Sequence, residues 1–306
     1  MGGRKMKTFE EILLQAQQQE KRKVISVAVA QDREVLLSVE EARKKGIIDG
    51  ILIGDSIKIK KIAGKLNIDL SNYKIIDKKD DMEAARQAVI EVSSGRADML
   101  MKGLVDTSVV LKAALDKEIG LRGEGVLSHV AVFEIENYDR LFFITDAAMN
   151  IAPNLETKKK IIDNSVKVAR ALGIKNPKVA CICAKEKVNK KMPDTVDAHE
   201  LEKMNKRGEI KNCTVGGPFA LDNAVSLEAS KHKGIDHEVA GMADILLAPD
   251  IEGGNILYKS ISYFAKSKGA GLIVGATAPI ILTSRADSEE TKLNSIILGA
   301  MTAGKL

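Results

Sequence analysis

The stretch Val24-Ile-Ser-Val-Ala-Val-Ala30 is apolar, rich in β-branched residues and of strand length, and it sets the pattern for the first half of the chain. A short helical pattern follows it at residues 39–45. Strand-like and helical runs then alternate, with strands predicted at 51–53, 74–76 and 98–101 and helices at 82–93 and 107–115. Apolar strands interleaved with helices predict a parallel sheet that helices cover on both faces.

The pattern changes near the middle of the chain. Two strand-like stretches, 130–133 and 141–144, follow each other closely, with Asn137-Tyr138-Asp139 between them. This predicts a hairpin and therefore a mixed sheet. The alternation then restarts, with strands predicted at 179–183, 244–247, 272–274 and 280–282 and helices at 155–172, 197–204, 218–230, 255–267 and 289–301.

The length of 306 residues suits two α/β lobes of ~150 residues each. The restart of the pattern near Asp139 marks the expected boundary between them, and no Pro-rich or Ser-rich linker is present. We therefore expect the lobes to pack directly against each other, with ligand sites in the cleft between them.

The composition is that of a globular protein, with 45% apolar and 29% charged residues. Lys and Arg outnumber Asp and Glu by 47 to 42, a scattered excess of +5 that mildly favours anionic small molecules. Aromatic residues make up 3% and Trp is absent, so base-stacking platforms for nucleic acid are not expected. The chain shows no signal peptide and no run of ~20 apolar residues, which predicts a cytoplasmic protein that does not bind membranes.

The cysteines and histidines do not form a ligand pattern. Cys181 and Cys183 alternate within an apolar run and Cys213 stands apart, which favours buried free thiols in a reducing compartment. The four histidines are far apart in sequence, so no metal site is predicted.

The first candidate for chemistry lies near the C-terminus, at residues 283–292, directly after the apolar run 278–282. Here Ser284 and Arg285 precede the carboxylates Asp287 and Glu290. A hydroxyl, a guanidinium and carboxylates at the end of a strand can hold an anion and move a proton.

Other polar groups also follow predicted strands. Lys102 can meet an anion at the junction 102–107, where Asp106 alternatively only caps a helix. Asp146 and Asn150 follow the strand at 141–144, where parallel-sheet proteins tend to place ligand groups, although a plain turn also explains them.

Three further segments carry the same kind of signal. Ser128 and His129 start a strand after two glycines, and a structural histidine is favoured over a catalytic one. The segment 248–255 contains Asp250 and Asn255, with Asn255 the expected helix cap in the simpler interpretation. Residues 216–223 are interpreted as a helix start with Pro218 in its first turn. Together these junctions fit a long, phosphate-bearing ligand that lies across a cleft.

Nearly the whole chain resembles the phosphate acetyl/butyryltransferase family, and most closely its butyryl branch. The resemblance is carried, in order, by residues 102–107, 128–129, 145–153, 216–223, 249–259 and 283–292. It implies the reversible reaction of an acyl-CoA with orthophosphate to give an acyl phosphate and free coenzyme A. No permanently bound cofactor is implied, because the coenzyme A thioester is a substrate.

The resemblance also implies a fold and an assembly. The fold is that of isocitrate and isopropylmalate dehydrogenases, two three-layer α/β/α lobes with a cleft, usually as a homodimer. In that fold the C-terminal segment returns to the first lobe. The expected lobes are therefore residues 1–138 with 276–306, and residues 139–275.

Residue roles follow from the matching motifs. In the acetyl members the serine and arginine act on the thioester and the phosphate, and they match Ser284 and Arg285. The aspartate proposed there as base for the thiol falls on Thr291 here, so Glu290 and Asp287 become the candidates, and the departure favours the butyryl branch. The remaining motif positions are expected to bind substrate: Lys102, Thr107, Ser128, His129, Asp146, Asn150, Asp250, Asn255, Lys259 and Thr283.

Two other functions remain open at this point. A metal- and NAD-dependent 2-hydroxy-acid dehydrogenase shares the implied fold and would need Asp244 and Asp250 as metal ligands. A non-catalytic coenzyme A-binding protein is the other, against which the intact Ser284 and Arg285 argue. No activated Cys or Ser triad is present, which predicts direct transfer in a ternary complex. Butyryl, isobutyryl, valeryl and isovaleryl substrates all remain open.

Overall fold

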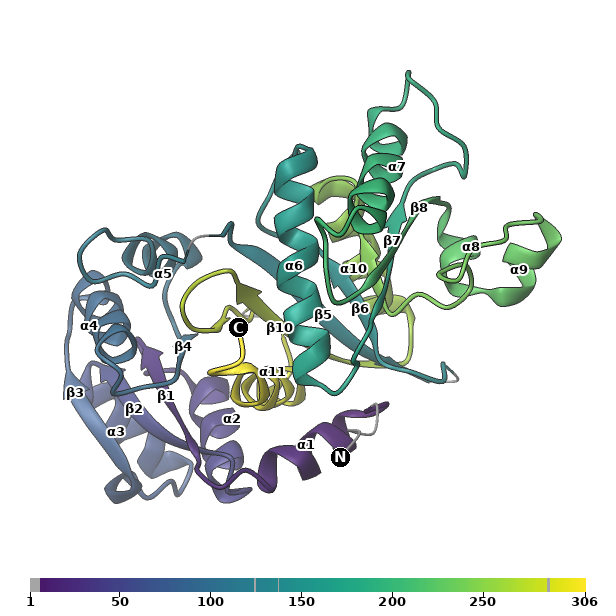
Figure 1. Cartoon of the computed structure of the whole chain (residues 1–306). Coiled ribbons are helices and arrows are strands. Elements are labelled where there is room, and N and C mark those ends of the chain that lie inside the picture. The colour runs from purple at the N-terminus through teal and green to yellow at the C-terminus, as the bar shows by residue number, and fades with distance from the viewer. Residues whose placement is uncertain (1–5, 124, 137, 285–286) are drawn as a thin grey trace. The chain divides into compact units, whose positions relative to one another are not determined.

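The computed structural model describes residues 6–123, 125–136, 138–284 and 287–306. The chain divides into two compact units, whose elements are labelled in Figure 1. The N-terminal unit comprises residues 9–125 and 269–306, and the middle unit comprises 126–268 together with the start of the chain to residue 8. The lobe boundaries expected from the sequence, 138/139 and 275/276, stay a prediction.

The N-terminal unit contains six neighbouring strands in the order β3-β2-β1-β4-β11-β10. All but the last are parallel, and β10 runs antiparallel to β11. This confirms the strand predictions for this part of the chain. The strands are β1 (Lys23–Ala28), β2 (Ile48–Gly54), β3 (Tyr73–Asp77), β4 (Met99–Lys102), β10 (Ser267–Val274) and β11 (Ile280–Ile281).

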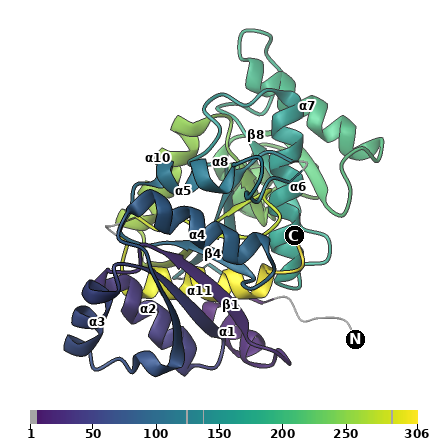
Figure 2. The same cartoon turned by 90° about the vertical axis from the view of Figure 1, so that its left-hand side faces the viewer.

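Helices cover both faces of this sheet. α4 and α5 pack together on one face, and α2 and α11 pack together on the other (Figure 2). The helices α1 and α3 and a short 3-10 helix were not expected from the sequence. The bounds are α1 (Phe9–Gln17), α2 (Arg33–Lys44), α3 (Ser56–Lys65), η1 (Leu70–Asn72), α4 (Asp81–Ser93), α5 (Thr107–Ala114) and α11 (Glu289–Thr302).

Aspartates start several of these helices. Asp32 caps α2 by accepting a hydrogen bond from the backbone N–H of Val35 at 2.9 Å. Asp55 caps α3 and Asp80 caps α4 in the same way. Each cap pairs N–H groups that have no partner within the helix, and it places a negative charge at the positive end of the helix dipole.

The middle unit contains five strands in the order β5-β6-β9-β7-β8. The strands β5 and β6 form the predicted antiparallel hairpin, and the remaining neighbours are parallel. α6 ends just before Gly173, which has a positive φ of 83°, as expected for a residue that follows a helix. The bounds are β5 (Ser128–Ile135), β6 (Phe142–Thr145), β7 (Lys178–Ile182), β8 (Thr214–Phe219), β9 (Ile245–Leu247), α6 (Leu155–Ala171), α7 (Pro193–Lys206), α8 (Leu221–Val225), α9 (Leu227–His232) and α10 (Ile251–Phe264).

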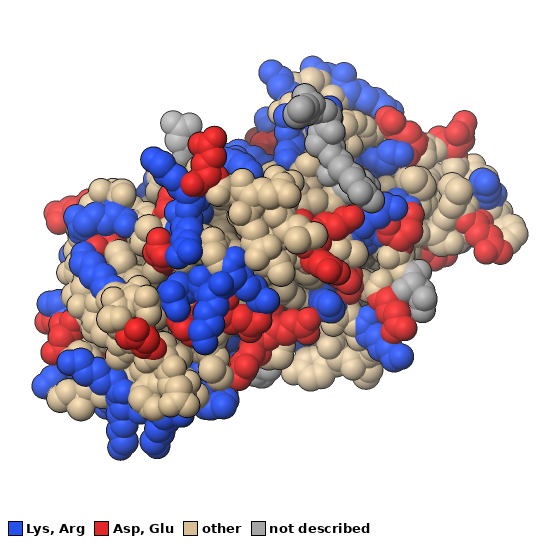
Figure 3. Space-filling view, turned by 90° about the horizontal axis from the view of Figure 1, so that it is seen from below, with Lys and Arg blue, Asp and Glu red and all other residues tan. Residues whose placement is uncertain are grey.

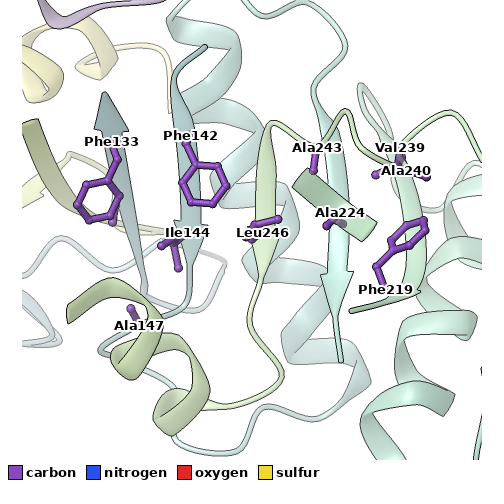
Figure 4. Packing of buried hydrophobic residues seen from close by; sticks show 12 residues of the cluster. Phe133, Phe142, Ile144, Ala147, Phe219, Ala224, Val239, Ala240, Ala243 and Leu246 are labelled. Atoms are coloured by element: carbon purple, nitrogen blue, oxygen red, sulfur yellow. The ribbon is translucent and has the colours of Figure 1, made fainter. Parts of the chain in front are cut away.

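The core of the middle unit is built around aromatic side chains on its strands. Phe133, Phe142 and Phe219 pack with smaller residues such as Ala224 and Leu246 (Figure 4). Side chains of α10 also pack against this cluster. Burial of these side chains stabilises the unit by about 1.5–3 kcal/mol for each large apolar group, and it fixes α10 against the strands.

Two predictions for the middle unit are wrong. The stretch 218–230 is not one helix, because Pro218 lies inside β8 and the helices α8 and α9 follow it. β8 is at the end of the strand order, and an edge strand tolerates a proline because it has neighbours on one side only. α10 begins at Ile251, not at residue 255, because Asp250 is the cap and accepts from the N–H of Gly253 at 2.7 Å.

The other global expectations can be compared with the described residues. Cys181, Cys183 and Cys213 are buried free thiols, as predicted, and burial raises the pKa of the Cys183 and Cys213 thiols to about 12. No described helix has the length and apolar character needed to cross a bilayer. Basic and acidic side chains are intermixed over the face drawn in Figure 3.

A buried carboxylate on α4 links stability to pH. Glu91 accepts hydrogen bonds from Arg96 at 2.9 and 3.0 Å, from Lys74 at 3.1 Å and from Gln87 at 2.8 Å. The Arg96 guanidinium is the main cause that lowers the pKa of this carboxyl from 4.5 to about 2. Since the pKa is lower in the folded chain, the ionised carboxylate stabilises the fold above about pH 4.5, and this stabilisation is lost as the pH falls toward 2.

We expect Glu91→Gln to lower the free energy of unfolding by about 1–3 kcal/mol at neutral pH, because the half-exposed Lys74 and Arg96 lose the buried, charged acceptor of their hydrogen bonds. The difference from the unmodified protein should narrow as the pH falls from 4.5 toward 2, because the Glu91 carboxyl then protonates first in the unfolded chain and only near pH 2 in the folded one. Urea unfolding over a pH series measures both quantities. Glu83→Gln, on the exposed face of the same helix, is the matched control and should change stability by less than ~0.5 kcal/mol. Equal effects of the two substitutions would contradict this role of Glu91.

Candidate active site

In the N-terminal unit, three adjacent parallel strands, β1, β4 and β11, end at the same edge of the sheet. The segments that follow them surround a small pocket of about 90 Å³. Polar strand ends at one sheet edge are the usual location for ligands in such folds. The pocket is lined by Asp32, Glu34, Val35, Lys102, Gly103, Leu104, Thr283, Ser284 and Lys292.

Gly103 allows the ends of β1 and β4 to come together. A Cβ atom at this position would lie 2.3 Å from the carbonyl oxygen of Val29 and 2.7 Å from that of Ala28. The N–H of Gly103 donates to the Ala28 oxygen at 2.8 Å. Only glycine fits such a close backbone approach, so this contact fixes where the neighbouring Lys102 lies.

Lys102 is buried beside the pocket, with a relative exposure of 6%. Its ammonium donates to the carbonyl oxygens of Gly103 at 3.3 Å and Val105 at 3.2 Å. Carbonyl dipoles offset part of the cost of burying the charge and keep it next to the pocket. The structure therefore brings Lys102 together with Thr283 and Ser284, three of the residues singled out in the sequence.

Thr107 does not join this group. It is the exposed first residue of α5 and is not among the pocket residues. Asp106 occupies the cap position of that helix, but its side chain makes no capping hydrogen bond. Asp106 is therefore the N-cap residue, as the simpler interpretation predicted, but without the side-chain hydrogen bond of a cap.

A tight turn connects β11 to α11 at the pocket. Thr283 is buried and Ser284 is exposed. The N–H of Ser284 donates to the Asp287 carboxylate at 2.7 Å, and the N–H of Asp287 donates back to the Ser284 oxygen at 3.1 Å. The Asp287 carboxylate therefore holds the turn, while Glu290 is exposed in the first turn of α11. Arg285 lies outside the described residues, and the catalytic roles of all four residues stay a prediction.

Lys292 lines the pocket but was not among the residues expected there from the sequence. Its side chain is buried, with a relative exposure of 3%, although it is the fourth residue of a helix. Its ammonium donates to the carbonyl oxygen of Asp287. The sequence does contain a signal for it, because Lys292 begins a run to Thr302 that has no other charged residue. In the structure every residue of this run is buried.

A second polar cluster lies in the middle unit around Asp146, which is buried at the end of β6. One carboxylate oxygen accepts from the N–H groups of His129 at 3.1 Å, Ala148 at 2.9 Å and Met149 at 3.0 Å. The other accepts from the N–H of Asn150 at 3.1 Å and from its side-chain amide at 2.6 Å. Asp146 therefore holds the loop after β6 against the start of β5.

Ser128 and His129 begin β5 in the interior of the middle unit. The Ser128 hydroxyl accepts a hydrogen bond from the side-chain amide of Asn164 at 2.9 Å, and Asn164 was not singled out in the sequence. The His129 ring lies edge-on to the ring of Tyr258, with centroids 5.6 Å apart. These contacts give both residues a structural task, whereas their binding of substrate stays a prediction.

The start of α10 packs on the loop that Asp146 organises. The side-chain amide of Asn255 donates to the Ala147 carbonyl oxygen at 3.1 Å. Gly254 approaches so closely that a Cβ atom would lie 2.3 Å from the carbonyl oxygen of Asp146. One turn further along α10, the Lys259 ammonium lies 5.2 Å from the centre of the Tyr258 ring. Ser128, His129, Asp146, Asn150 and Asn255 therefore belong to one connected cluster.

The two carboxylates that a metal-dependent dehydrogenase would need, Asp244 and Asp250, bind backbone N–H groups in this structure. Asp244 is buried and accepts from the N–H of Lys178 at 2.9 Å, while Asp250 caps α10. Within the described ranges, no three His, Cys, Asp or Glu side chains are grouped to hold a metal ion.

We expect Gly254→Ala to destabilise the protein by about 1–3 kcal/mol, because the new methyl group must push α10 away from the loop at Asp146. Gly64→Ala is the matched control, since a Cβ there meets nothing within 4 Å and alanine favours a helix. Urea unfolding of the two variants gives the comparison. A Gly254→Ala protein as stable as the unmodified one would show that this contact is loose.

Comparison with known proteins finds relatives that match almost the whole chain. The family model described as Phosphate acetyl/butaryl transferase matches residues 8–86 and 81–300. Phosphate butyryltransferase of Clostridium acetobutylicum is 54% identical over 299 residues, which covers 98% of this chain and 99% of the relative. The crystal structure of a branched-chain phosphotransacylase from Enterococcus faecalis V583 is 35% identical, with a TM-score of 0.82 over 93% of this chain and 100% of that one.

A more distant structure matches in fold alone. The 4-hydroxythreonine-4-phosphate dehydrogenase of Klebsiella pneumoniae is 11% identical and covers 92% of this chain and 100% of that one, with a TM-score of 0.60. This confirms the predicted dehydrogenase-like α/β fold. Because the family model matches almost the entire length and the relatives align from end to end, the chain belongs to the phosphate acetyl/butyryl transferase family.

Proposed function

We propose that this protein transfers a butyryl or related short or branched acyl group from coenzyme A to orthophosphate, reversibly, giving an acyl phosphate and free coenzyme A. The observation that carries the proposal is the pocket at the ends of β1, β4 and β11 in a chain of this family. It combines buried ammonium groups with the hydroxyl-bearing residues Thr283 and Ser284.

Phosphate is a well-hydrated anion, and the thioester carbonyl gains negative charge when phosphate attacks it. A site for this reaction must therefore offer positive charge and hydrogen-bond donors in a partly dry space. Lys102 supplies a fixed ammonium, and Arg285, if it takes the role that the family resemblance implies, supplies paired donors to phosphate oxygens.

The proposed step is a direct substitution at the acyl carbon. A phosphate oxygen forms a bond to the carbonyl carbon, and the carbon–sulfur bond then breaks with its electron pair leaving on sulfur. The Ser284 hydroxyl can donate to the oxyanion of the intermediate, an interaction typically worth ~3–4 kcal/mol. In the reverse direction the thiol of coenzyme A must lose a proton, for which Glu290 and Asp287 are the proposed bases.

No covalent acyl-enzyme is required. The three thiols are poor nucleophiles, because burial raises the pKa of Cys183 and Cys213 to about 12 and raises that of Cys181 further. This supports direct transfer between coenzyme A and phosphate in a ternary complex. A cytoplasmic location stays a prediction from the sequence composition, and a homodimer stays a prediction from the family resemblance.

A thiol-release assay tests the proposed function. Purified protein, butyryl-CoA and inorganic phosphate should release free thiol and butyryl phosphate in equal amounts, and omission of phosphate should abolish the release. Absence of phosphate-dependent thiol release with butyryl-, isobutyryl-, valeryl- and isovaleryl-CoA would overturn the proposal. Formation of reduced cofactor from NAD⁺, Mg²⁺ and a 2-hydroxy acid would support the dehydrogenase alternative instead.

Arg285→Ala should lower the turnover number at least ~100-fold, because it removes the donors that hold the attacking phosphate, and the loss of an electrostatic donor at a reacting anion typically costs this much. Ser284→Ala should lower it for the same reason. The control is Arg22→Ala, which removes an exposed guanidinium paired with Asp49 and should leave turnover unchanged. Circular dichroism checks that each variant is folded, and near-normal turnover of Arg285→Ala would remove this residue from the mechanism.

A further inference from the structure

The pocket beside Ser284 contains two buried ammonium groups, those of Lys102 and Lys292, with relative exposures of 6% and 3%. Lysine is almost never fully buried unless its charge is compensated. Two such groups facing one small pocket also repel each other. Whether the pocket needs an anion therefore depends on the partners of Lys292, the more deeply buried of the two.

The positive charge of Lys292 has no carboxylate partner among the described residues. An ammonium group has three N–H donors. Among the described residues, one of them goes to the Asp287 carbonyl oxygen, and no described Asp or Glu forms an ion pair with Lys292. A buried side chain at the wall of the pocket thus keeps donors available for a ligand.

The two acidic residues that line the pocket, Asp32 and Glu34, do not form an ion pair with Lys292. The Asp32 carboxylate caps α2 through the N–H of Val35. Glu34 is half-buried in the first turn of the same helix, where its negative charge favours the helix dipole. Both lower the positive potential of the pocket, so the bound anion must make direct hydrogen bonds to the lysines.

We propose that Lys292, together with Lys102, binds the phosphoryl oxygens of orthophosphate and of the acyl phosphate product. The inference rests on the proposed function and adds Lys292 to its binding residues. The Lys292 ammonium donates hydrogen bonds to phosphoryl oxygens. Through the Asp287 carbonyl oxygen it also contacts the turn whose N–H to carboxylate bond positions Ser284.

Coenzyme A carries phosphoryl groups as well, so the source of the anion must be established. Orthophosphate is the better fit, because the pocket holds about 90 Å³ and is lined by Ser284 itself. A phosphoryl group of coenzyme A lies at the far end of a long chain from the thioester. The two sources predict different kinetics, since the first changes the KM for phosphate and the second changes the KM for butyryl-CoA.

The experiment uses two variants. Lys292→Met keeps the length and removes the charge, and Lys292→Gln keeps a donor for the Asp287 carbonyl while removing the charge. We expect both to raise the KM for phosphate at least ~10-fold, the loss typical of a hydrogen bond from a charged group. The KM for butyryl-CoA should change less than ~2-fold. Lys60→Met, on the exposed face of α3, is the control and should match the unmodified enzyme.

A binding measurement without acyl-CoA makes the test independent of turnover. Inorganic phosphate should slow amide hydrogen exchange in the peptide 283–292 of the unmodified protein, as read by mass spectrometry. This measurement decides the matter even if neither variant folds. The proposal is overturned by an unchanged phosphate KM in a folded variant, by a selective rise in the KM for butyryl-CoA, or by absence of phosphate protection. If the unmodified enzyme fails to release thiol but phosphate protects the peptide, the proposed function fails and the anion site stands.

Discussion

The close backbone contact between Gly103 and the end of β1 is the constraint on which the N-terminal site depends. A side chain at this position would collide with two carbonyl oxygens, so β4 can end beside β1 only with glycine there. This contact determines where Lys102 emerges. Since β11 lies parallel to β4 on its other side, the turn that carries Ser284 reaches the same edge. Charge and hydroxyl groups therefore meet because of backbone packing.

In the middle unit a carboxylate, that of Asp146, holds the strand ends and the following loop together. Asp146 accepts hydrogen bonds from backbone N–H groups on both sides of the β5–β6 hairpin, and Gly254 lets α10 pack directly on that loop. In a phosphotransacylase, polar residues at strand ends thus divide into two kinds. Asp146 and Asp287 hold backbone in place, whereas Lys102 and Lys292 direct charge toward a pocket. The hydrogen bonds of each side chain show whether it holds the backbone or faces a pocket, which the residue type alone does not show.

Much of the fold follows from sequence periodicity, and the failures have physical reasons. The β5–β6 hairpin was predicted because two short apolar runs are too close for a crossover helix. α3 was missed because Ile57-Lys-Ile-Lys60 alternates like a strand. Pro218 was assigned to a helix start, although an edge strand holds it. At the site, Lys102 and Ser284 were predicted from their positions after strands. Lys292 was not, because it lies within a helix and not directly after a strand, and its sequence signal is only the uncharged run 293–302 that follows it.

The two-segment composition of the N-terminal unit has a consequence for synthesis on the ribosome. The middle unit is almost entirely one continuous segment, whereas the sheet begun by β1 is completed only when β11 and α11 have emerged. α11 packs against α2, which precedes it by more than half the chain. A domain folds as a unit once its segments are available. The middle unit can therefore fold during translation, while the apolar face of α2 must wait for the last helix and is exposed to aggregation or chaperone binding in the interval.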